Sequence, residues 1–557
     1  MAKRRKSLHP DAPLLHRDHS RPVTRRDFLR QGFISGTGMV MSSSILSLFA
    51  NPRVARAALS PDILARAGEL RNAAGVPSCI LGAGVGAGKI PFICFDLAGG
   101  ANICGSNVLV GGPGGQLDFL STAGYSKMGL PGDMVPGGVE PAGFSETGTS
   151  NGDFIDESLG LRFHADSAFL RGILEKAPGV IGSVNGAVIP ARSDNDTGNN
   201  PHNPMYGIAK AGRQGSVVSL IGSRNSDSGG NSMAPAMLFD PEIRPTKVDR
   251  PTDVTGMVDT GNLLGVLDNK ADVVAVMESV ARLSDIKMGL VEPGITNSEV
   301  IRDLVRCGYF KAADLADRFA DVKLDPGEDG FIVDGADPDN VTETGIFTRD
   351  EFNSDREFQK TAAVMKMVID GADGGYAGAG TIAMGGYDYH TGDRSTGELR
   401  DLRAGRCIGA CLDYARRKGQ PLMIYVFSDG SLASNGTVLS AAMDPDNRGK
   451  PVWTGDNSST AAAFFLVYNP SGMPQLRGVT LDEQLSHQQI GYFRADGSVE
   501  TSSSPAANNV NLLVETVILN YMALNGDIGL FPGLFTGFGA SPSPALLDSL
   551  TAFGPLA

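Results

Sequence analysis

Short apolar runs of strand length alternate along the chain with segments of helical periodicity. The runs with the length and composition of buried strands are 91–95, 216–221, 381–384, 422–427 and 464–468. Between them lie amphipathic segments that predict helices at 167–177, 271–285, 297–318, 356–371, 395–418 and 509–524. This alternation predicts an α/β fold rather than an all-α or all-β fold.

The clearest of these helices covers residues 395–418. Ser395 and Glu398 stand at the spacing of a capping box. Apolar residues then recur close to a helical stripe, and Gly419 follows a run of basic residues, which is typical of a helix C-terminus. By contrast, the stretches 98–160 and 186–260 are rich in Gly, Asn, Ser and Pro with little periodicity. They are too long for ordinary connections, so we expect long Gly/Asn-rich loop insertions over the sheet.

Charge is distributed unevenly along the chain. The 557 residues carry a formal net charge of −14, and 41% of them are hydrophobic. This apolar content is ample for a core and an acidic surface repels phosphate backbones, so a disordered polymer is excluded and no nucleic-acid partner is expected. Residues 1–57 carry 11 basic and three acidic side chains, a net +8, which leaves −22 for the remainder. The N-terminal segment is therefore a distinct part of the chain.

This N-terminal segment resembles a twin-arginine export signal, whose pattern is S/T-R-R-x-F-L-K. The pattern is matched by Thr24, Arg25, Arg26, Phe28 and Leu29, and Arg30 keeps the positive charge of its last position. A weakly apolar stretch follows at 33–50. A small-residue site then places Ala55 and Ala57 on either side of one arginine, which predicts cleavage after Ala57.

The resemblance implies that the twin-arginine translocase is a partner during export. The mature chain is then expected to be 58–557, a single large domain with insertions, in the periplasm or outside the cell. No other run of about 18 apolar residues is present, so we expect no stable membrane span in the mature chain. The alternative is that 1–57 forms a short membrane anchor or a basic amphipathic helix.

All six cysteines lie after residue 57, where an oxidising compartment would permit disulfides. Their spacing gives no metal-binding pattern. Cys407 and Cys411 fall four residues apart on one predicted helix, so we expect them to pack in a core rather than to bond to each other. For a loop disulfide, Cys79 with Cys104 is the favoured pair.

Polar clusters follow several of the predicted strands. In α/β sheets the carboxyl ends of the strands are where sites are built. Carboxylates mixed with imidazole form the ligand set of zinc, manganese or magnesium in hydrolytic sites. The alternative is that these are turns capped by Asp and Asn. The residues that follow strands are Asp96, Asn102, Asp388, His390, Ser428 and Asp429. Asp456 and Asn457 lie just before strand 464–468, and the loop 193–206 adds Asp194, Asp196 and His202.

The segments GG-x-N, a loop histidine, GGYDYH, FSDGSLASNG and TGDNSS occur in this order. The order resembles a family of bacterial domain-of-unknown-function proteins, commonly exported by the twin-arginine route, that is grouped with the alkaline phosphatase and sulfatase superfamily. The pattern of that family is GG-x-D-G, S-H-F, G-W-D-T-H, S-E-F-G-R-T with a following N-G, and G-x-D-H-G. Over about residues 91–470, the resemblance implies a mixed, mainly parallel, alkaline-phosphatase-like sheet flanked by helices, with a metal-binding cleft at the strand ends.

The resemblance also implies which residues bind the metal. Asp388 and His390 match the D-T-H motif, Asp429 stands where the family has Glu, His202 matches the histidine of S-H-F, and Asp456 matches the aspartate of D-H-G. The chain departs from the pattern at Asn102 and Asn457, which replace an aspartate and a histidine, and Leu432 or a neighbour replaces the arginine. Amides are weaker ligands, so the site is expected to lose affinity or one ion.

Some roles remain open at this level. Asp96 lies six residues before Asn102 and is a substitute ligand for the missing aspartate. No hydroxyl is clearly placed as a nucleophile, and the candidates are Ser193, Thr197 and Ser428.

The polar clusters and the family resemblance together lead to two hypotheses for the function. The first is an exported metal-dependent hydrolase of phosphate or sulfate esters. The alternative is a catalytically degenerate superfamily member that serves as a periplasmic or envelope binding protein. An oxidoreductase is disfavoured, because the chain has no dinucleotide, haem or iron–sulfur motif.

Overall fold

The structure, a computed structural model, describes residues 59–70, 79, 88–193, 200–258, 270–290, 298–319, 322–337, 343–371 and 375–556. Thr197 lies outside these residues, as do the residues assigned to the export signal and its cleavage site: Arg25, Arg26, Phe28, Leu29, Ala55 and Ala57. Within the described part of the chain, no helix combines the length and apolar character needed to cross a membrane.

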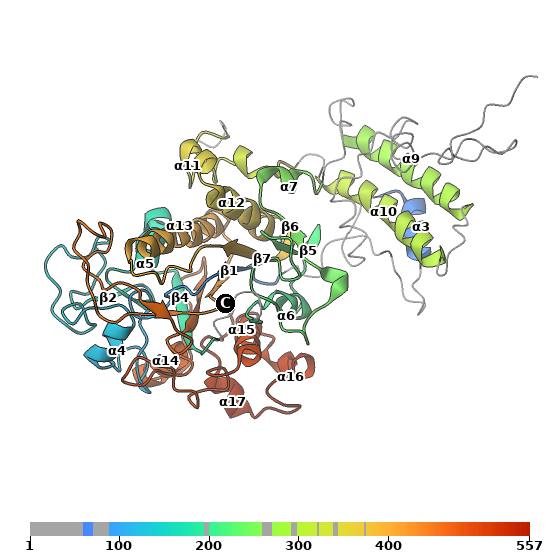
Figure 1. Cartoon of the computed structure of the whole chain (residues 1–557). Coiled ribbons are helices and arrows are strands. Elements are labelled where there is room, and N and C mark those ends of the chain that lie inside the picture. The colour runs from blue at the N-terminus through green and yellow to red at the C-terminus, as the bar shows by residue number, and fades with distance from the viewer. Residues whose placement is uncertain are drawn as a thin grey trace, which may run out of the picture.

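A seven-stranded sheet forms the centre of the molecule (Figure 1). Its order is β4 (Val184–Pro190), β11 (Ala462–Tyr468), β8 (Leu422–Phe427), β1 (Phe92–Leu97), β7 (Ala377–Met384), β5 (Val218–Gly222) and β6 (Thr246–Lys247). β11 runs antiparallel to both of its neighbours, and all other pairings are parallel. The prediction of a mixed, mainly parallel α/β sheet is therefore confirmed.

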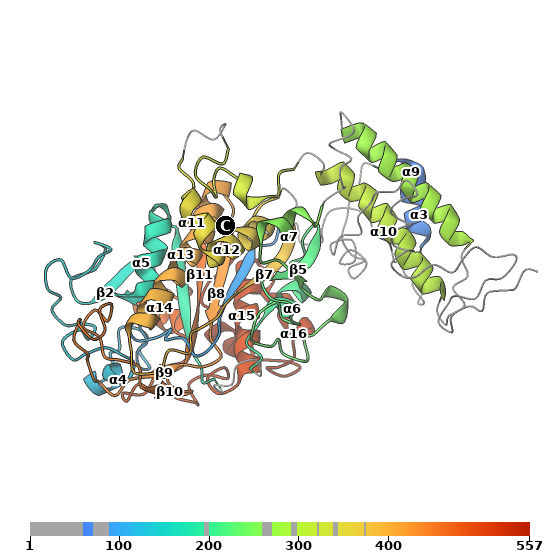
Figure 2. The same cartoon turned by 45° about the horizontal axis from the view of Figure 1, so that its top comes forward.

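Helices cover both faces of the sheet (Figure 2). Alternate residues of β1 serve the two faces: Ile93 and Phe95 belong to the core shared with α5 (Ala168–Lys176), α12 (Arg356–Ile369) and α13 (Ser395–Lys418). Phe92 and Cys94 belong to the core shared with α6 (Met205–Lys210) and α15 (Val510–Leu524). Because both faces are buried, the strands read as continuous apolar runs.

Shorter elements connect these layers. They are α4 (Thr122–Lys127), β2 (Ile155–Leu159), β3 (Leu161–His164), α7 (Pro251–Thr255), α11 (Arg349–Ser354), β9 (Leu432–Ala433), β10 (Gly455–Asp456), α14 (Leu481–Gln488), α16 (Phe531–Leu534) and α17 (Pro544–Ser549). The segment 98–160 is largely loop, as expected, whereas 186–260 also contains most of β4 and all of α6, β5, β6 and α7.

The helix predicted at 395–418 is confirmed with the same bounds, but its predicted capping box is wrong. The Ser395 hydroxyl contacts the carboxylate of Asp444, which also accepts hydrogen bonds from the Arg394 and Ser395 amides. Glu398 accepts instead from Arg394 Nε and Lys450 Nζ. A carboxylate that is distant in sequence therefore caps this helix, and no local pattern could reveal it.

A second body of structure is built from α3 (Pro61–Glu69), α9 (Lys270–Gly289) and α10 (Ser298–Phe319), which share a hydrophobic core of their own. It contains a disulfide between Cys79 and Cys307, so the predicted pairing of Cys79 with Cys104 is wrong. Cys104 is free and buried. The packing of α10 beside α3 brings together two cysteines 228 residues apart. Cys407 and Cys411 are free and buried, as predicted.

Candidate metal site

The candidate site lies beyond the carboxyl ends of β1, β7 and β8, which run parallel to one another. Asp388 and His390 belong to the loop that follows β7, and Asp429 is the second residue after β8. Asp456 is in β10, where it pairs with Leu432 of β9. The short β9–β10 ribbon therefore folds Asp456 back beside the loop that leaves β8.

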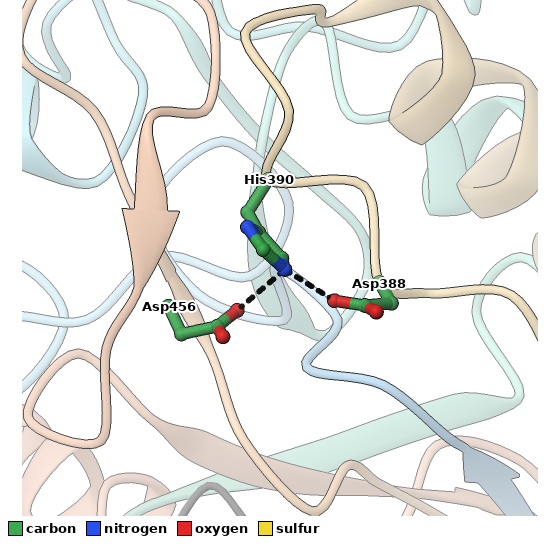
Figure 3. A group of neighbouring side chains, drawn as sticks. All are labelled: Asp388, His390 and Asp456. Carbon is green, nitrogen blue, oxygen red and sulfur yellow. Dashed lines mark ion pairs between the residues drawn. The ribbon is translucent and has the colours of Figure 1, made fainter.

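Asp388, His390 and Asp456 form one cluster, with a ligand atom from each within 4.8 Å of the others. His390 Nε2 is 2.5 Å from Asp388 Oδ1 and 3.5 Å from Asp456 Oδ1. Both carboxylates point toward this single nitrogen (Figure 3). The side chains are 65%, 32% and 37% exposed for Asp388, His390 and Asp456, so the cluster is open to solvent.

A two-residue period in the loop after β7 explains why Asp388 and His390 face the same way. Tyr387 and Tyr389 alternate with them and are buried. The Tyr387 hydroxyl donates to the Arg400 carbonyl over 3.0 Å, and the Tyr389 hydroxyl donates to Asp401 Oδ1 over 3.0 Å. The two rings hold the loop against α13, and the intervening side chains are directed outward.

Asp401 is a part of this arrangement that the sequence does not single out. It is buried, and besides Tyr389 it receives a hydrogen bond of 2.9 Å from Asn107 Nδ2. Burial, with the negative charge of Glu398 nearby, raises the pKa of Asp401 to about 8. The only sequence signal for this support is the apolar–polar alternation of Tyr387-Asp388-Tyr389-His390, which indicates a half-buried extended segment.

Asp429 lies near the cluster but, unlike the three clustered residues, it is buried. Its carboxylate is buried, and Oδ1 accepts a hydrogen bond of 2.8 Å from the Gly99 amide. Oδ2 has no hydrogen-bond partner among the described residues. Gly99 has φ +121°, and a Cβ atom there would lie 2.5 Å from the Asp388 amide nitrogen. Gly99 therefore separates Asp429 from Asp388 and allows their backbones to approach closely.

His202 is buried away from the three clustered residues. Its ring stacks on Phe427 with the centroids 5.8 Å apart, and its Nε2 lies 3.1 Å from Ser193 Oγ. Burial lowers the pKa of His202 to about 4, so the ring is neutral near pH 7. The structure does not bring this predicted ligand to the surface of the site.

Asp96, the substitute ligand, is also buried. Its carboxylate accepts hydrogen bonds from the amides of Asn231 and Ser232, at 2.7 and 2.8 Å, and from the Ser232 hydroxyl at 3.2 Å. Burial raises the pKa of Asp96 to about 6, and the charge of Asp429 adds to this effect. Asp96 therefore fixes the loop after β5 rather than joining the exposed cluster.

Each described nucleophile candidate donates its hydroxyl to a backbone carbonyl. The Ser193 hydroxyl donates to the Asp429 carbonyl over 2.5 Å. The Ser428 hydroxyl donates to the Leu97 carbonyl over 2.6 Å and accepts from the Ala101 amide over 2.8 Å. Both side chains are buried, so each fixes a turn at the strand ends.

The two asparagines that the sequence resemblance aligns with metal ligands, Asn102 and Asn457, also have local partners. Asn102 Nδ2 donates to the Ser106 hydroxyl, and Asn457 Oδ1 accepts from the amide and hydroxyl of Ser459. These contacts are those of polar turns.

The donor set of the exposed cluster fits a divalent cation. Two carboxylates and one imidazole suit zinc and manganese, and carboxylates with water suit magnesium. Three protein ligands with an open side are the arrangement of a hydrolytic site. No model of a known protein family, no curated protein and no solved structure matches the chain, so the argument for function rests on the geometry of this cluster.

Proposed function

We propose that the protein is an exported metal-dependent hydrolase that binds one divalent cation, zinc, manganese or magnesium, through Asp388, His390 and Asp456. The observation that carries the proposal is the convergence of both carboxylates on His390 Nε2 within an exposed cluster. The position of the cluster at the carboxyl ends of parallel strands adds support.

The proposed chemistry is hydrolysis of phosphate or sulfate esters. A divalent ion supplies Lewis acidity: it lowers the pKa of the water that it contacts and neutralises negative charge on an ester oxygen. Asp388 and Asp456 provide anionic donors, and His390 provides a neutral nitrogen donor when Nε2 is unprotonated. The partial exposure of all three side chains gives water and substrate access to them. In this proposal the twin-arginine translocase delivers the folded protein to the periplasm or the exterior.

A second candidate is a catalytically degenerate relative of the alkaline phosphatase and sulfatase superfamily that acts as a periplasmic or envelope binding protein. Two observations favour it. The described hydroxyl candidates, Ser193 and Ser428, are buried and bound to backbone carbonyls. Asn102 and Asn457 stand where the family has an acid and a histidine, and both have internal hydrogen-bond partners.

Elemental analysis of purified mature protein, residues 58–557, tests the metal proposal. We expect about one divalent ion per chain, retained after gel filtration, and its loss in Asp388→Asn. Asp482→Asn is the matched control, because Asp482 is an exposed aspartate on α14, away from the cluster. Folded protein that takes up no zinc, manganese or magnesium would contradict the proposal.

Assays on phosphate and sulfate esters separate the two candidates. The hydrolase predicts turnover that a chelator abolishes, that added metal restores and that His390→Ala lacks. Metal-loaded protein without turnover on either ester class would favour the binding protein.

A further inference from the structure

A basic cavity of about 370 Å³ lies at the carboxyl ends of the strands, as the candidate metal site does. It lies where β5, β6 and β7 end and α12 begins, and Figure 2 shows α12 beside β7. Its lining residues are Ser223, Arg224, Asn225, Lys247, Asp249, Arg356, Glu357, Lys360, Ala383 and Gly385. None of the clustered metal-site residues lines it.

The cavity is positively charged in an otherwise acidic protein. Its four basic side chains outnumber its two carboxylates by two, whereas the whole chain carries −14. Asp249 pairs with Lys247 over 2.9 Å and also with Arg356. Glu357 pairs with Lys360 over 2.7 Å. The two carboxylates therefore hold three of the basic side chains in place, and a net charge of two positive units remains.

Several donors in the cavity remain free to bind a ligand. No hydrogen bond or ion pair joins the Arg224 guanidinium to another described residue, and Arg224 is exposed. Lys360 is largely buried, and its ammonium donates to Glu357 and to the Ala383 carbonyl, which leaves one of its three N–H groups. The Arg356 side chain is 58% exposed, and its guanidinium has further N–H groups beyond the one directed to Asp249.

We propose that this cavity binds the phosphate or sulfate group of a small molecule. The excess of two positive charges matches a dianion, and the donors come from β6, from the loop after β5 and from two successive turns of α12. Donors from several directions suit a tetrahedral oxyanion, which accepts hydrogen bonds on all sides, better than a planar carboxylate.

The location of the cavity gives it a role beside the metal site, and this step rests on the proposed function. Gly385 lines the cavity and Asp388 follows three residues later, so their Cα atoms are at most about 10 Å apart. A cation on the cluster and an oxyanion in the cavity would contact different groups of one substrate. The substrate class is therefore an ester that carries a second phosphate or sulfate group.

Calorimetric titration of inorganic phosphate and sulfate into mature protein tests the cavity itself. Using chelator-treated His390→Ala protein removes binding at the metal cluster, so the result is independent of whether the hydrolase proposal holds. We expect saturable binding with a Kd of about 1 mM or below. Arg224→Ala and Arg356→Ala should each weaken it about tenfold, through loss of a charge-assisted hydrogen bond.

Arg494→Ala is the matched control, because Arg494 is 52% exposed and, among the residues that the structure describes, its ion pair is with Glu500, outside the cavity. Its affinity for phosphate should equal that of the parent. Absence of saturable binding, an equal loss in all three arginine variants, or acetate binding as tightly as phosphate would overturn the proposal.

Discussion

The Tyr389 hydroxyl donates a hydrogen bond of 3.0 Å to Asp401 Oδ1, across the space between the loop after β7 and helix α13. The same hydroxyl accepts a hydrogen bond of 3.2 Å from the backbone amide of Asn102. One buried oxygen therefore joins the segment that carries His390 to the helix and to the segment after β1. The orientation of His390 therefore depends on its neighbour Tyr389, whose side chain is buried.

Tyr389→Phe should weaken both the fold and the metal site. The substitution leaves the buried Asp401 carboxylate and the backbone amide of Asn102 each without one partner, which should cost about 1–3 kcal/mol in the free energy of unfolding. Because the loop loses its support, affinity for zinc should fall about tenfold, as for other residues that orient ligands. Denaturant unfolding and metal titration measure the two effects.

Tyr387→Phe is the control for this prediction. It removes only the hydrogen bond from Tyr387 to the Arg400 carbonyl, so it should cost about 1 kcal/mol. If both variants bind zinc as the parent does, the Tyr389 hydroxyl does not support the site.

Gly99→Ala should disturb the site more than Gly392→Ala, although both glycines have positive φ values, +121° and +89°. A Cβ atom at Gly392 would meet nothing within 4 Å, so that variant should cost only about 1–2 kcal/mol of backbone strain. At Gly99 the Cβ would lie 2.5 Å from the Asp388 amide nitrogen, so the backbone must move. We expect a further loss of about 1–3 kcal/mol.

Metal titration of the same two alanine variants tests whether Gly99 positions the cluster. Zinc affinity should fall in Gly99→Ala and stay near that of the parent in Gly392→Ala. Equal affinities in the two variants would show that the close approach of Gly99 to Asp388 does not affect the cluster.

The strands of the sheet could be predicted because most are buried on both faces and read as apolar runs. β4 and β6 are the exceptions. β6 is only two polar residues, Thr246 and Lys247, and the sequence of β4, VNGAVIP, contains Asn185 and Gly186, which interrupt the apolar run although the whole strand is buried. β4 lies at one edge of the sheet, and Asn185 Nδ2 donates to the Pro474 carbonyl. Its burial depends on long-range contacts that local pattern does not encode.

The candidate site could be predicted only in part, for a related reason. Position after a strand identifies Asp388 and His390, position just before strand 464–468 identifies Asp456, and the structure brings these three together. Position after a strand also selects Asp96, and the polar loop 193–206 supplies His202, but both side chains are buried and directed elsewhere. The end of a strand fixes where a residue lies in the sheet, but tertiary packing determines which way its side chain points.

Replacing Cys79 and Cys307 by serine should destabilise the protein by about 2–4 kcal/mol, because the disulfide restricts a long loop in the unfolded chain. The core shared by α3, α9 and α10 is small and should unfold first. Thermal unfolding followed by circular dichroism measures the change. Thiol titration of denatured, unreduced protein should find the four free cysteines; six reactive thiols would contradict the disulfide.

The buried imidazole of His202 should make stability depend on pH. Its pKa in the folded protein is about 4, below the ordinary value of 6.5, because burial disfavours the charged ring. Between these values the unfolded chain binds a proton that the folded protein does not, so stability rises with pH by up to about 1.4 kcal/mol per unit. This contribution is fully present above about pH 6.5 and is lost as the pH falls toward 4.

His202→Gln removes this titration, so the parent and the variant should differ in their pH dependence over the same range. The parent's free energy of unfolding, minus that of the variant, should increase between pH 4 and pH 6.5 and then level off. Urea unfolding at half-unit steps of pH measures this difference. Because His202 lies away from the exposed cluster, His202→Gln should also retain zinc, whereas His390→Gln should lose it. Parallel stability curves would show that His202 titrates normally in the folded protein, and loss of zinc in His202→Gln would restore it to the ligand set.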